Sequence, residues 1–202
     1  MQKFIKNFLS ESSWISSNLD VKKIGLMVKK IKSCKKNKGR IFFLGVGGSA
    51  GNASHAVNDF RKIIGIESYA PTDNVSELTA RTNDEGWSEI FCQWLNTSNL
   101  KSKDIIFIFS VGGGNIKKNI SVNLIKAIKF AKKKKCNILS VIGKSNGYAA
   151  KNSDVAVVIP VKNQKLLTPF SEAYQALIWH LLVSHPELKE KETKWESVIE
   201  KK

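Results

Sequence analysis

Short, continuously apolar runs alternate with helical patterns along most of this chain. The strand-like runs are Ile41–Leu44, Asp104–Ser110, Asn137–Gly143 and Val155–Val161, with a weaker fifth run at Glu67–Ala70. Helical spacing of apolar residues marks the stretches between them, at Asn52–Ile64, Trp87–Leu95 and Lys117–Lys134 and near Tyr148. Strands that are apolar throughout are typical of a parallel sheet with helices on both faces. The sequence therefore predicts a three-layer, flavodoxin-like α/β fold with a five-stranded parallel sheet.

Helical segments precede and follow this core. Apolar spacing predicts two helices within residues 1–36, and Asp20 is placed to cap the second. The same spacing predicts helices at Ser171–Val183 and Glu187–Glu200, with Pro186 between them. No internal repeat or low-complexity linker divides the chain. We expect a single domain over 1–202, with N-terminal helices at 1–36, an α/β core at 37–185 and a C-terminal helix at 186–202.

The net charge of +16 raises the question of a nucleic-acid or membrane partner. The basic residues are mostly lysines spread through the helical segments, with one run at Lys132–Lys135. The sequence has neither an arginine-rich stripe nor the interleaved aromatic residues of an RNA-binding sheet. Lysine on solvated faces is the simpler explanation, so we expect neither nucleic acid nor a membrane as partner. A positive field would still help to gather phosphorylated substrates.

Cysteine usage and the N-terminus indicate the compartment. Cys34, Cys92 and Cys136 are an odd number without C-x-x-C spacing, which predicts free thiols in a reducing environment. No apolar stretch approaches the ~18 residues of a membrane span. The first residues also lack the apolar region of a signal peptide. We expect a cytoplasmic protein.

The most informative motif is Ile41–Phe60, which reads IFFLGVGGSAGNASHAVNDF. Its apolar run leads into a turn at Gly47–Ser49, and a helical pattern follows. Such a turn presents unpaired backbone N–H groups and the positive end of a helix dipole, which suits a phosphate. His55 and Asp59 are four residues apart and therefore share one face of the helix. This combination is typical of a sugar-phosphate site.

Nucleotide-binding folds use the same strand–turn–helix arrangement. Gly45, Gly47 and Ala50 fit the loose dinucleotide pattern G-x-G-x-x-[GA]. The acidic residue of that pattern should close a second strand, however, whereas Glu67 at best opens one. The P-loop pattern G-x-x-x-x-G-K-[ST] is absent, so a phosphosugar is the favoured ligand.

Two further segments are candidates for the same crevice. Ser110–Asn115 (SVGGGN) directly follows an apolar run and precedes a helix, and Thr82–Gly86 (TNDEG) lies before it in the chain. Consecutive glycines open the backbone so that its N–H groups can surround an anion. Ligands of parallel α/β sheets bind at the carboxyl ends of the strands. We therefore expect these segments to line one site with Gly45–Ser49.

The other reactive groups, Glu172 and His180, lie in the predicted helix Ser171–Val183. A separation of eight residues gives about 12 Å of helix rise, so the two side chains converge poorly on one point. We expect them to act together only if Glu172 lies in a frayed first turn. His185 is expected to be a surface or capping residue.

Over roughly residues 20–185, the chain resembles the sugar-isomerase (SIS) domain family, and specifically its phosphoheptose isomerases. The resemblance rests on GVGGSAGNASHAVNDF, TNDEGW, FSVGGGN and SEAYQALIWH. In that family a Gly-Gly-Ser turn binds substrate, a His with a Glu four residues later starts the catalytic helix, and a Gln followed eight residues later by His ends the site. The substrate-binding positions that the resemblance implies are Gly47, Gly48, Ser49, Asn83, Asp84, Ser110, Val111, Gly112, Asn115 and Glu172.

The resemblance also implies a metal site. His55, Asp59, Glu172 and His180 occupy the positions that bind zinc in family members, and two imidazoles with two carboxylates suit that ion. Asp59, Glu172 and His180 are the implied catalytic residues.

Several positions depart from the family pattern. The Asn before the glycine turn is Val46 here, and an Arg expected after the catalytic helix is Ile63, beside Arg61 and Lys62. A Ser/Thr-rich phosphate loop is replaced by the glycines of Ser110–Asn115, so backbone N–H groups must do more of the binding. These departures leave the exact substrate open.

The implied chemistry is an aldose–ketose isomerisation through a cis-enediol. The family's Glu and Gln are Asp59 and Glu172 here, so either carboxylate can be the general base, with His180 as the acid. Zinc, if bound, would stabilise the enediolate as a Lewis acid, and no organic cofactor is needed. The expected reaction converts sedoheptulose 7-phosphate to D-glycero-D-manno-heptose 7-phosphate, for nucleotide-heptose in lipopolysaccharide or capsule biosynthesis.

Two alternatives remain at this point. The first is a non-catalytic SIS module that senses a phosphosugar or binds a protein partner, and the second is a nucleic-acid-binding protein that uses the positive charge. Retention of both histidines and both carboxylates favours the enzyme. The resemblance further implies a homotetramer with sites at subunit interfaces. We expect Asp59 and His180 of one site to come from different chains.

Overall fold

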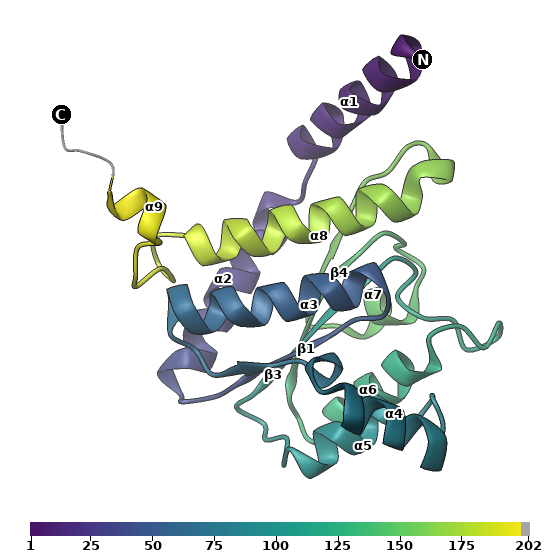
Figure 1. The fold of residues 1–202 in the computed structure, drawn as a ribbon, viewed down its shortest axis with the longest axis vertical. Helices are drawn as coiled ribbons and strands as arrows, with labels where there is room; N and C mark the ends of the chain where they lie inside the picture. The colour runs from purple at the N-terminus through teal and green to yellow at the C-terminus, as the bar shows by residue number, and fades with distance from the viewer. Residues whose placement is uncertain (199–202) are drawn as a thin grey trace.

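Five parallel strands form the central sheet, in the order β2-β1-β3-β4-β5 (Figure 1). The strands are β1 (Ile41–Leu44), β2 (Ser68–Tyr69), β3 (Ile105–Ser110), β4 (Asn137–Ile142) and β5 (Val155–Val158). The computed structural model describes residues 1–198, except for the side chains of residues 195 and 196. The strand order is that of flavodoxin-like folds, in which ligands bind where the order reverses, here between β1 and β3. The predicted fold is confirmed.

Both faces of the sheet are covered because the strands are apolar on both faces. Successive side chains of a strand point to opposite sides. Phe107 and Phe109 of β3 join the core under α2 (Val21–Lys36), α3 (Gly48–Asp59) and α8 (Leu167–Ser184). Ile106 and Ile108 join the opposite core, under α5 (Ile90–Thr97), α6 (Val122–Lys133) and α7 (Tyr148–Asn152).

The N-terminal pair of helices is confirmed as α1 (Gln2–Ser17) and α2, and Asp20 caps α2 by accepting from the Lys23 N–H (3.0 Å). In Figure 1, α1 projects away from the sheet beside the start of α8. Stacking of Phe8 on Phe170, with ring centroids 4.5 Å apart, attaches it there. Within the described residues, none of the helices has the length and apolarity to span a bilayer.

The predicted bounds of three core helices are corrected, and the simplest case is α5, which begins at Ile90 rather than Trp87. α3 begins at Gly48 rather than Asn52, because the turn before it is short, and it continues into a π-helical turn, η1 (Phe60–Ile64). α6 begins at Val122 rather than Lys117. The preceding residues form a tight loop, closed by two backbone hydrogen bonds between Asn115 and Ile120 (2.9 and 3.0 Å).

One helix, α4 (Val75–Asp84), was not predicted. None of its residues is buried, so the sequence has no apolar stripe to indicate it. The Asn74 side chain caps it by accepting from the Glu77 N–H (3.2 Å). Thr82–Gly86, one of the segments predicted to line the crevice, is therefore the last turn of this helix and the turn that follows.

The predicted C-terminal helix over Glu187–Glu200 is wrong for most of its length. Among the described residues of that segment, only α9 (Lys194–Ser197) is helical, and residues 199 and 200 lie outside the described part. Pro186 ends α8 with a turn, since proline cannot continue a helix. The Glu190 N–H bonds to the carbonyl of Ile63 in η1 (3.1 Å). It is therefore not available for a hydrogen bond within the predicted C-terminal helix.

The three cysteines are free, as predicted. The pKa of Cys34 and that of Cys136 are each raised to about 12, mainly by burial of the thiol. Both thiols are thus un-ionised at neutral pH, and un-ionised thiols are poor nucleophiles.

A buried ion pair fixes the starts of β1 and β3. Asp104 is fully buried and accepts hydrogen bonds from the backbone N–H groups of Arg40 and Lys101, both 2.9 Å long. Its carboxylate also accepts from Nη2 of Arg40 (2.8 Å), and this side-chain hydrogen bond raises the pKa of the guanidinium. A buried carboxylate with this many donors is tightly specified.

We expect Asp104→Ala to lower the free energy of unfolding by roughly 3–5 kcal/mol, because it leaves buried donors and a partly buried guanidinium unpaired. Urea unfolding measures this. Asp20→Ala is the matched control, since it removes an exposed cap that is worth about 1 kcal/mol. Equal losses in the two variants would contradict the role of the buried pair.

Candidate active site

The turn between β1 and α3 exposes its backbone to solvent. Gly47 has φ +62° and ψ −128°, a conformation that glycine adopts without strain. α3 starts without a side-chain cap, so its first N–H groups and the positive end of its dipole face the carboxyl end of β1. Gly47 and Gly48 are exposed, whereas Ser49 is only 2% exposed. A ligand at this turn therefore meets backbone rather than the Ser49 side chain.

Glu172 lies against this turn. A Cβ atom added to Gly48 would overlap its carboxylate, so the absence of a side chain at Gly48 makes room for Glu172. The condition for joint action with His180, a frayed first turn at Glu172, is not met. α8 begins at Leu167, which puts Glu172 in the second turn of a formed helix.

α3 and α8 lie side by side and run in the same direction (Figure 1). Nδ2 of Asn52 donates to the backbone carbonyl of Glu172 (2.9 Å) and to Oε1 of Gln175 (3.0 Å), and Gln175 is fully buried. This amide fixes the register between the two helices. No sequence pattern indicates this role of Asn52.

Three of the four predicted metal ligands meet further along the same two helices. Each of His55, Asp59 and His180 offers one ligand atom, and these atoms all lie within 4.8 Å of one another. Oδ2 of Asp59 is 3.9 Å from Nε2 of His55 and 4.0 Å from Nε2 of His180. Glu172 is not part of this cluster within the chain. Asp59 and His180 meet in one chain, so the expectation that they come from different chains is corrected.

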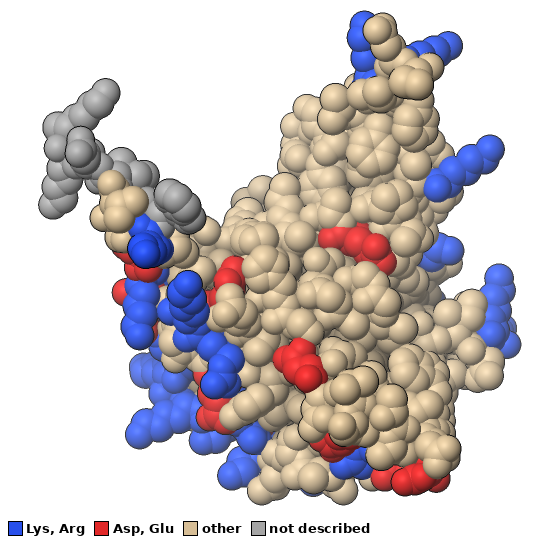
Figure 2. All heavy atoms as spheres, viewed as in Figure 1, with Lys and Arg blue, Asp and Glu red and all other residues tan. Residues whose placement is uncertain are grey.

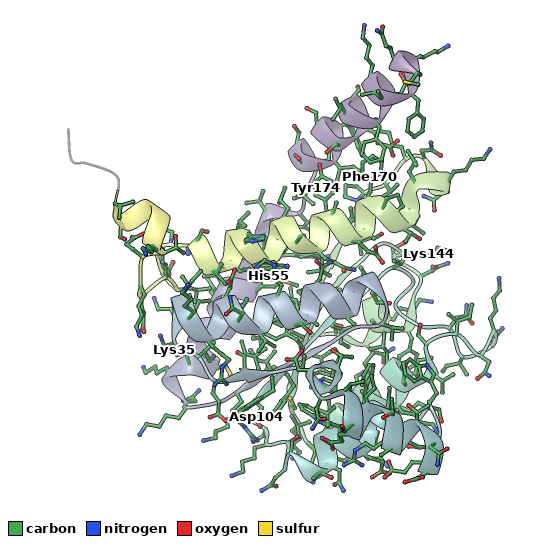
Figure 3. All side chains as sticks on the ribbon, viewed as in Figure 1. Lys35, His55, Asp104, Lys144, Phe170 and Tyr174 are labelled. Carbon is green, nitrogen blue, oxygen red and sulfur yellow. The ribbon has the colours of Figure 1, made fainter. Side chains whose placement is uncertain are left out.

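The surroundings of the cluster orient its donors. Nδ1 of His180 lies 2.8 Å from the Ala176 carbonyl, which can only accept, so Nδ1 has the proton and Nε2 is free in the neutral ring. Asn58 donates to the other oxygen of Asp59 (2.8 Å). The side chains of His55 and His180 are 59% and 52% exposed, against 13% for Asp59. Figure 3 shows His55 on α3, directed towards α8.

The loops after β3 and β4 form a second part of the crevice. Backbone N–H groups of Gly143, Tyr148 and Ala149 donate to the carbonyls of Val111, Gly114 and Gly113, at 2.9, 2.9 and 2.8 Å. Both loops are thus bonded to each other as well as to their strands.

Within the first loop, Ser110 has a structural contact. Its hydroxyl accepts from the Gly113 N–H (3.0 Å), and the residue is 7% exposed. Asn115 is exposed, and its Oδ1 accepts from the Lys118 N–H (3.0 Å). These contacts leave Gly112, Gly114 and Asn115 to line a cavity of about 170 Å³.

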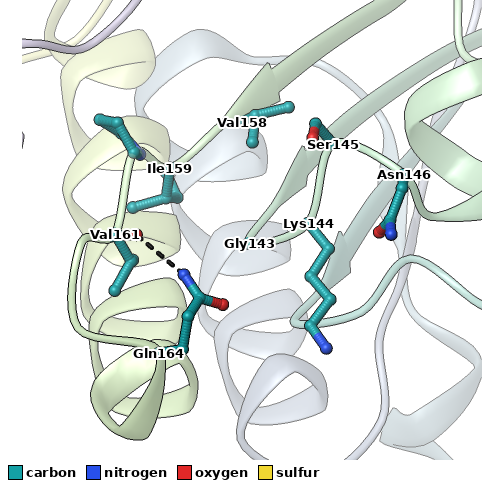
Figure 4. Close-up of a pocket in the computed structure, with 9 residues that line it drawn as sticks. Gly143, Lys144, Ser145, Asn146, Val158, Ile159, Val161 and Gln164 are labelled. Carbon is teal, nitrogen blue, oxygen red and sulfur yellow. Dashed lines mark hydrogen bonds between the residues drawn. The ribbon is translucent and has the colours of Figure 1, made fainter.

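A larger cavity of about 460 Å³ adjoins the carboxyl ends of β4 and β5 (Figure 4). Val158, Ile159 and Val161 give it an apolar side, and Gln164 donates across it to the Val161 carbonyl (3.0 Å). Lys144 and Asn146 line both this cavity and the smaller one, so the two hollows are neighbours.

Asn83 and Asp84 lie apart from these contacts. Both are exposed at the end of α4, where Asn83 donates to the Asp84 carboxylate (2.8 Å). Their proposed contact with substrate stays a prediction. Lys118 and Lys144, by contrast, were not singled out by the sequence, in which they are two of many lysines.

Comparison with known proteins assigns the chain to a family. The family model described as "SIS domain" matches residues 7–143. The chain belongs to the SIS domain family. This confirms the resemblance that the motifs indicated.

The relatives of this SIS domain include phosphoheptose isomerases. That of Sulfurimonas denitrificans is 30% identical over 192 residues, which cover 90% of this chain and 93% of that protein. The lincomycin biosynthesis protein LmbN of Streptomyces lincolnensis is 28% identical over 192 residues, 90% of this chain and 68% of that protein. A solved phosphoheptose isomerase from Francisella tularensis has the same fold, with a TM-score of 0.79 at 21% identity over 91% of this chain and 96% of that one.

We expect Gly48→Ala to lower isomerase turnover with little change in stability. The three atoms nearest to the added methyl all belong to the end of the Glu172 side chain, so the carboxylate must move away while the helix stays intact. Gly51→Ala is the matched control. No atom lies within 4 Å of its added Cβ, so turnover should persist and the helix should gain about 0.5–1 kcal/mol. Equal turnover in both variants would contradict a role for the position of Glu172.

Proposed function

We propose that this chain isomerises sedoheptulose 7-phosphate to D-glycero-D-manno-heptose 7-phosphate. The observation that supports this most directly is the meeting of Asp59 with the histidines His55 and His180 on two helices that also hold Glu172 against a glycine turn. The names of its relatives support the substrate class, and the pathway is nucleotide-heptose synthesis for lipopolysaccharide or capsule. The proposed location is the cytoplasm.

Asp59 is the proposed general base and His180 the proposed acid. Moving a carbonyl between neighbouring carbons requires a base and an acid within a few ångströms of each other. Asp59 takes a proton from C1 of the ketose and returns it to C2. His180, in its imidazolium form, gives the Nε2 proton to O2 and receives the proton of O1 at the same nitrogen. The 4.0 Å between Oδ2 of Asp59 and Nε2 of His180 suits this exchange. Glu172, at the glycine turn, holds hydroxyl groups of the substrate.

Glu172 is the alternative base, since its carboxylate lies next to the turn that substrate would contact. The two roles give different results on substitution. With Asp59 as base, we expect Asp59→Asn and His180→Gln each to lose ~10²–10⁴-fold in turnover. Glu172→Gln should then mainly raise KM. His185→Gln is the control for loss of an imidazole, and it should leave turnover unchanged.

If Glu172→Gln loses nearly all turnover and Asp59→Asn loses less, Glu172 and not Asp59 is the general base. If the parent isomerises no phosphosugar, the enzyme proposal is wrong and the sensing module takes its place. Binding of a phosphosugar without turnover identifies that outcome.

The donor set fits zinc. Two imidazole nitrogens and one carboxylate oxygen are the ligand types of catalytic zinc sites, which have three protein ligands and an open position. The His180–Ala176 hydrogen bond orients one of these donors, as second-shell contacts of metal ligands do. His55, Asp59 and His180 would hold the ion, and Glu172 is outside the set in this chain. When bound, zinc would supply Lewis-acid stabilisation of negative charge on the substrate oxygens. Because it would occupy Nε2 of His180 and a carboxylate oxygen of Asp59, Glu172 would be the free base in the zinc-loaded protein.

We expect zinc to raise the midpoint of thermal unfolding of the parent protein. An ion that binds only the native state, at 100 times its Kd, stabilises that state by ~2.7 kcal/mol. His55→Gln should abolish the shift, whereas His185→Gln should retain it. A parent protein without any zinc-dependent shift, together with no zinc in elemental analysis, would contradict the site.

The proposed assembly is a homotetramer. The exposed apolar side chains of α1, which are Phe4 (63%), Ile5 (49%) and Leu9 (62%), support association through this helix. Charge does not gather into one stripe on the face drawn in Figure 2, where Lys and Arg lie mainly at the margins. This distribution suits a small anionic substrate as well as it suits general solubility, and no nucleic-acid or membrane partner is proposed.

A further inference from the structure

We infer that Lys118 and Lys144 bind the phosphate group of the substrate, in the cavity between the loops after β3 and β4. This inference rests on the proposed function, because it takes a phosphosugar as the ligand. It adds two specific cations that the glycine-rich loop itself does not provide. The cavity of about 170 Å³ is lined by both lysines together with Gly112, Gly114 and Asn115.

The composition of the cavity favours an anion. All its lining residues are glycine, asparagine, isoleucine or lysine, so no carboxylate faces the two cations there. Some other lysines of the chain are paired with carboxylates, such as Lys35 with Glu190 and Lys126 with Glu89. Among the described residues, no carboxylate forms an ion pair with Lys118 or Lys144. Their charge is therefore available to a ligand.

Lys118 is held at the cavity by local backbone geometry. Two hydrogen bonds between Asn115 and Ile120 close its loop, and Oδ1 of Asn115 accepts from the Lys118 N–H (3.0 Å). Asn119 takes a left-handed conformation, with φ +53°, which completes the tight turn. The backbone position of Lys118 is thus fixed before any ligand arrives.

Lys144 reaches the same cavity from the other loop. It follows Gly143, whose N–H is bonded to the Val111 carbonyl (2.9 Å), and it precedes Gly147, whose N–H bonds to the Lys144 carbonyl (3.3 Å). Figure 4 shows its side chain extended from the strand end, with no hydrogen bond drawn to it, and Figure 3 places it at the edge of the molecule near this loop. The two lysines therefore approach one cavity from different loops.

The chemistry of recognition follows from the ligand. A phosphate monoester is largely dianionic at neutral pH and offers three acceptor oxygens. Lysine binds phosphate as a compact charge with three donors. Backbone N–H groups of an open glycine loop accommodate the remaining oxygen atoms. The cavity thereby selects phosphorylated sugars over their uncharged counterparts.

The loop that holds Lys144 lies close to the proposed catalytic residues. A Cβ on Gly143 would overlap the Ser171 hydroxyl, and Ser171 is fully buried beside Glu172 in the chain. The loop that holds Lys144 thus packs directly on the part of α8 that supplies Glu172. Phosphate at this cavity would place the sugar towards α3 and α8.

The test compares Lys118→Gln, Lys144→Gln and their double variant with the parent. Each loss of a charged hydrogen bond to phosphate should raise KM about tenfold, with kcat little changed, because a remote phosphate is bound equally in the ground and transition states. Inorganic phosphate should inhibit the parent competitively, and its inhibition constant should rise in the same variants. Lys144→Arg retains the charge and should restore most of the affinity.

Lys117→Gln is the matched control, since Lys117 is exposed on the same loop but does not line the cavity. Unchanged KM in the double variant of an active enzyme would overturn the inference and leave the proposed function standing. Phosphate that binds without competing with substrate would also overturn it, in favour of an effector site. If the parent is inactive, calorimetric binding of inorganic phosphate to the parent and variants decides the inference separately, and equal affinity in all of them overturns it.

Discussion

The parallel packing of α3 against α8 determines where the reactive groups of this chain lie. The partly buried amide of Asn52 bonds to two residues of α8 and fixes the register of the pair. One helical turn is 5.4 Å long. A slip of α8 by a single turn would therefore separate His180 from Asp59 and remove Glu172 from Gly48 at the same time. One polar contact thus positions two groups of residues that are about 12 Å apart along the helix.

Much of the fold could be predicted because the strands are buried on both faces. Continuous apolar runs such as Ile105–Ser110 exist only where helices cover both sides of a sheet, so the pattern itself identified the layers. α4 could not be predicted in the same way. Its residues are all at least partly exposed, and a helix without a buried stripe leaves no periodic pattern in the sequence.

The error at the C-terminus has a related cause. The segment after Pro186 has the composition of a helix, but its backbone donors are used elsewhere. The N–H groups of Glu190 and Lys191 both bond to the Ile63 carbonyl in η1, and Lys32 pairs with Glu187. Tertiary contacts of this kind override local propensity, and they cannot be read from the segment alone.

The types of residue in the site were predictable, but not how they are grouped. Spacing placed His55 and Asp59 on one face of a helix, and the structure confirms that placement. The position of Glu172 depends instead on where α8 begins. Because that helix starts at Leu167, Glu172 faces Gly48 and not the histidines. The expectation that Glu172 and His180 bind one metal ion came from the family resemblance, and their separation along the helix prevents it within one chain.

The hydrogen bonds between the loops after β3 and β4 have a thermodynamic consequence. Flexible loops lose conformational entropy when a ligand orders them, and that loss reduces affinity. Here the bonds from Gly143, Tyr148 and Ala149 have already ordered both loops in the free chain. Association then requires no slow rearrangement of the backbone, and the lifetime of a complex depends on the contacts it makes. Such a preorganised crevice is suited to small, abundant metabolites that must enter and leave quickly.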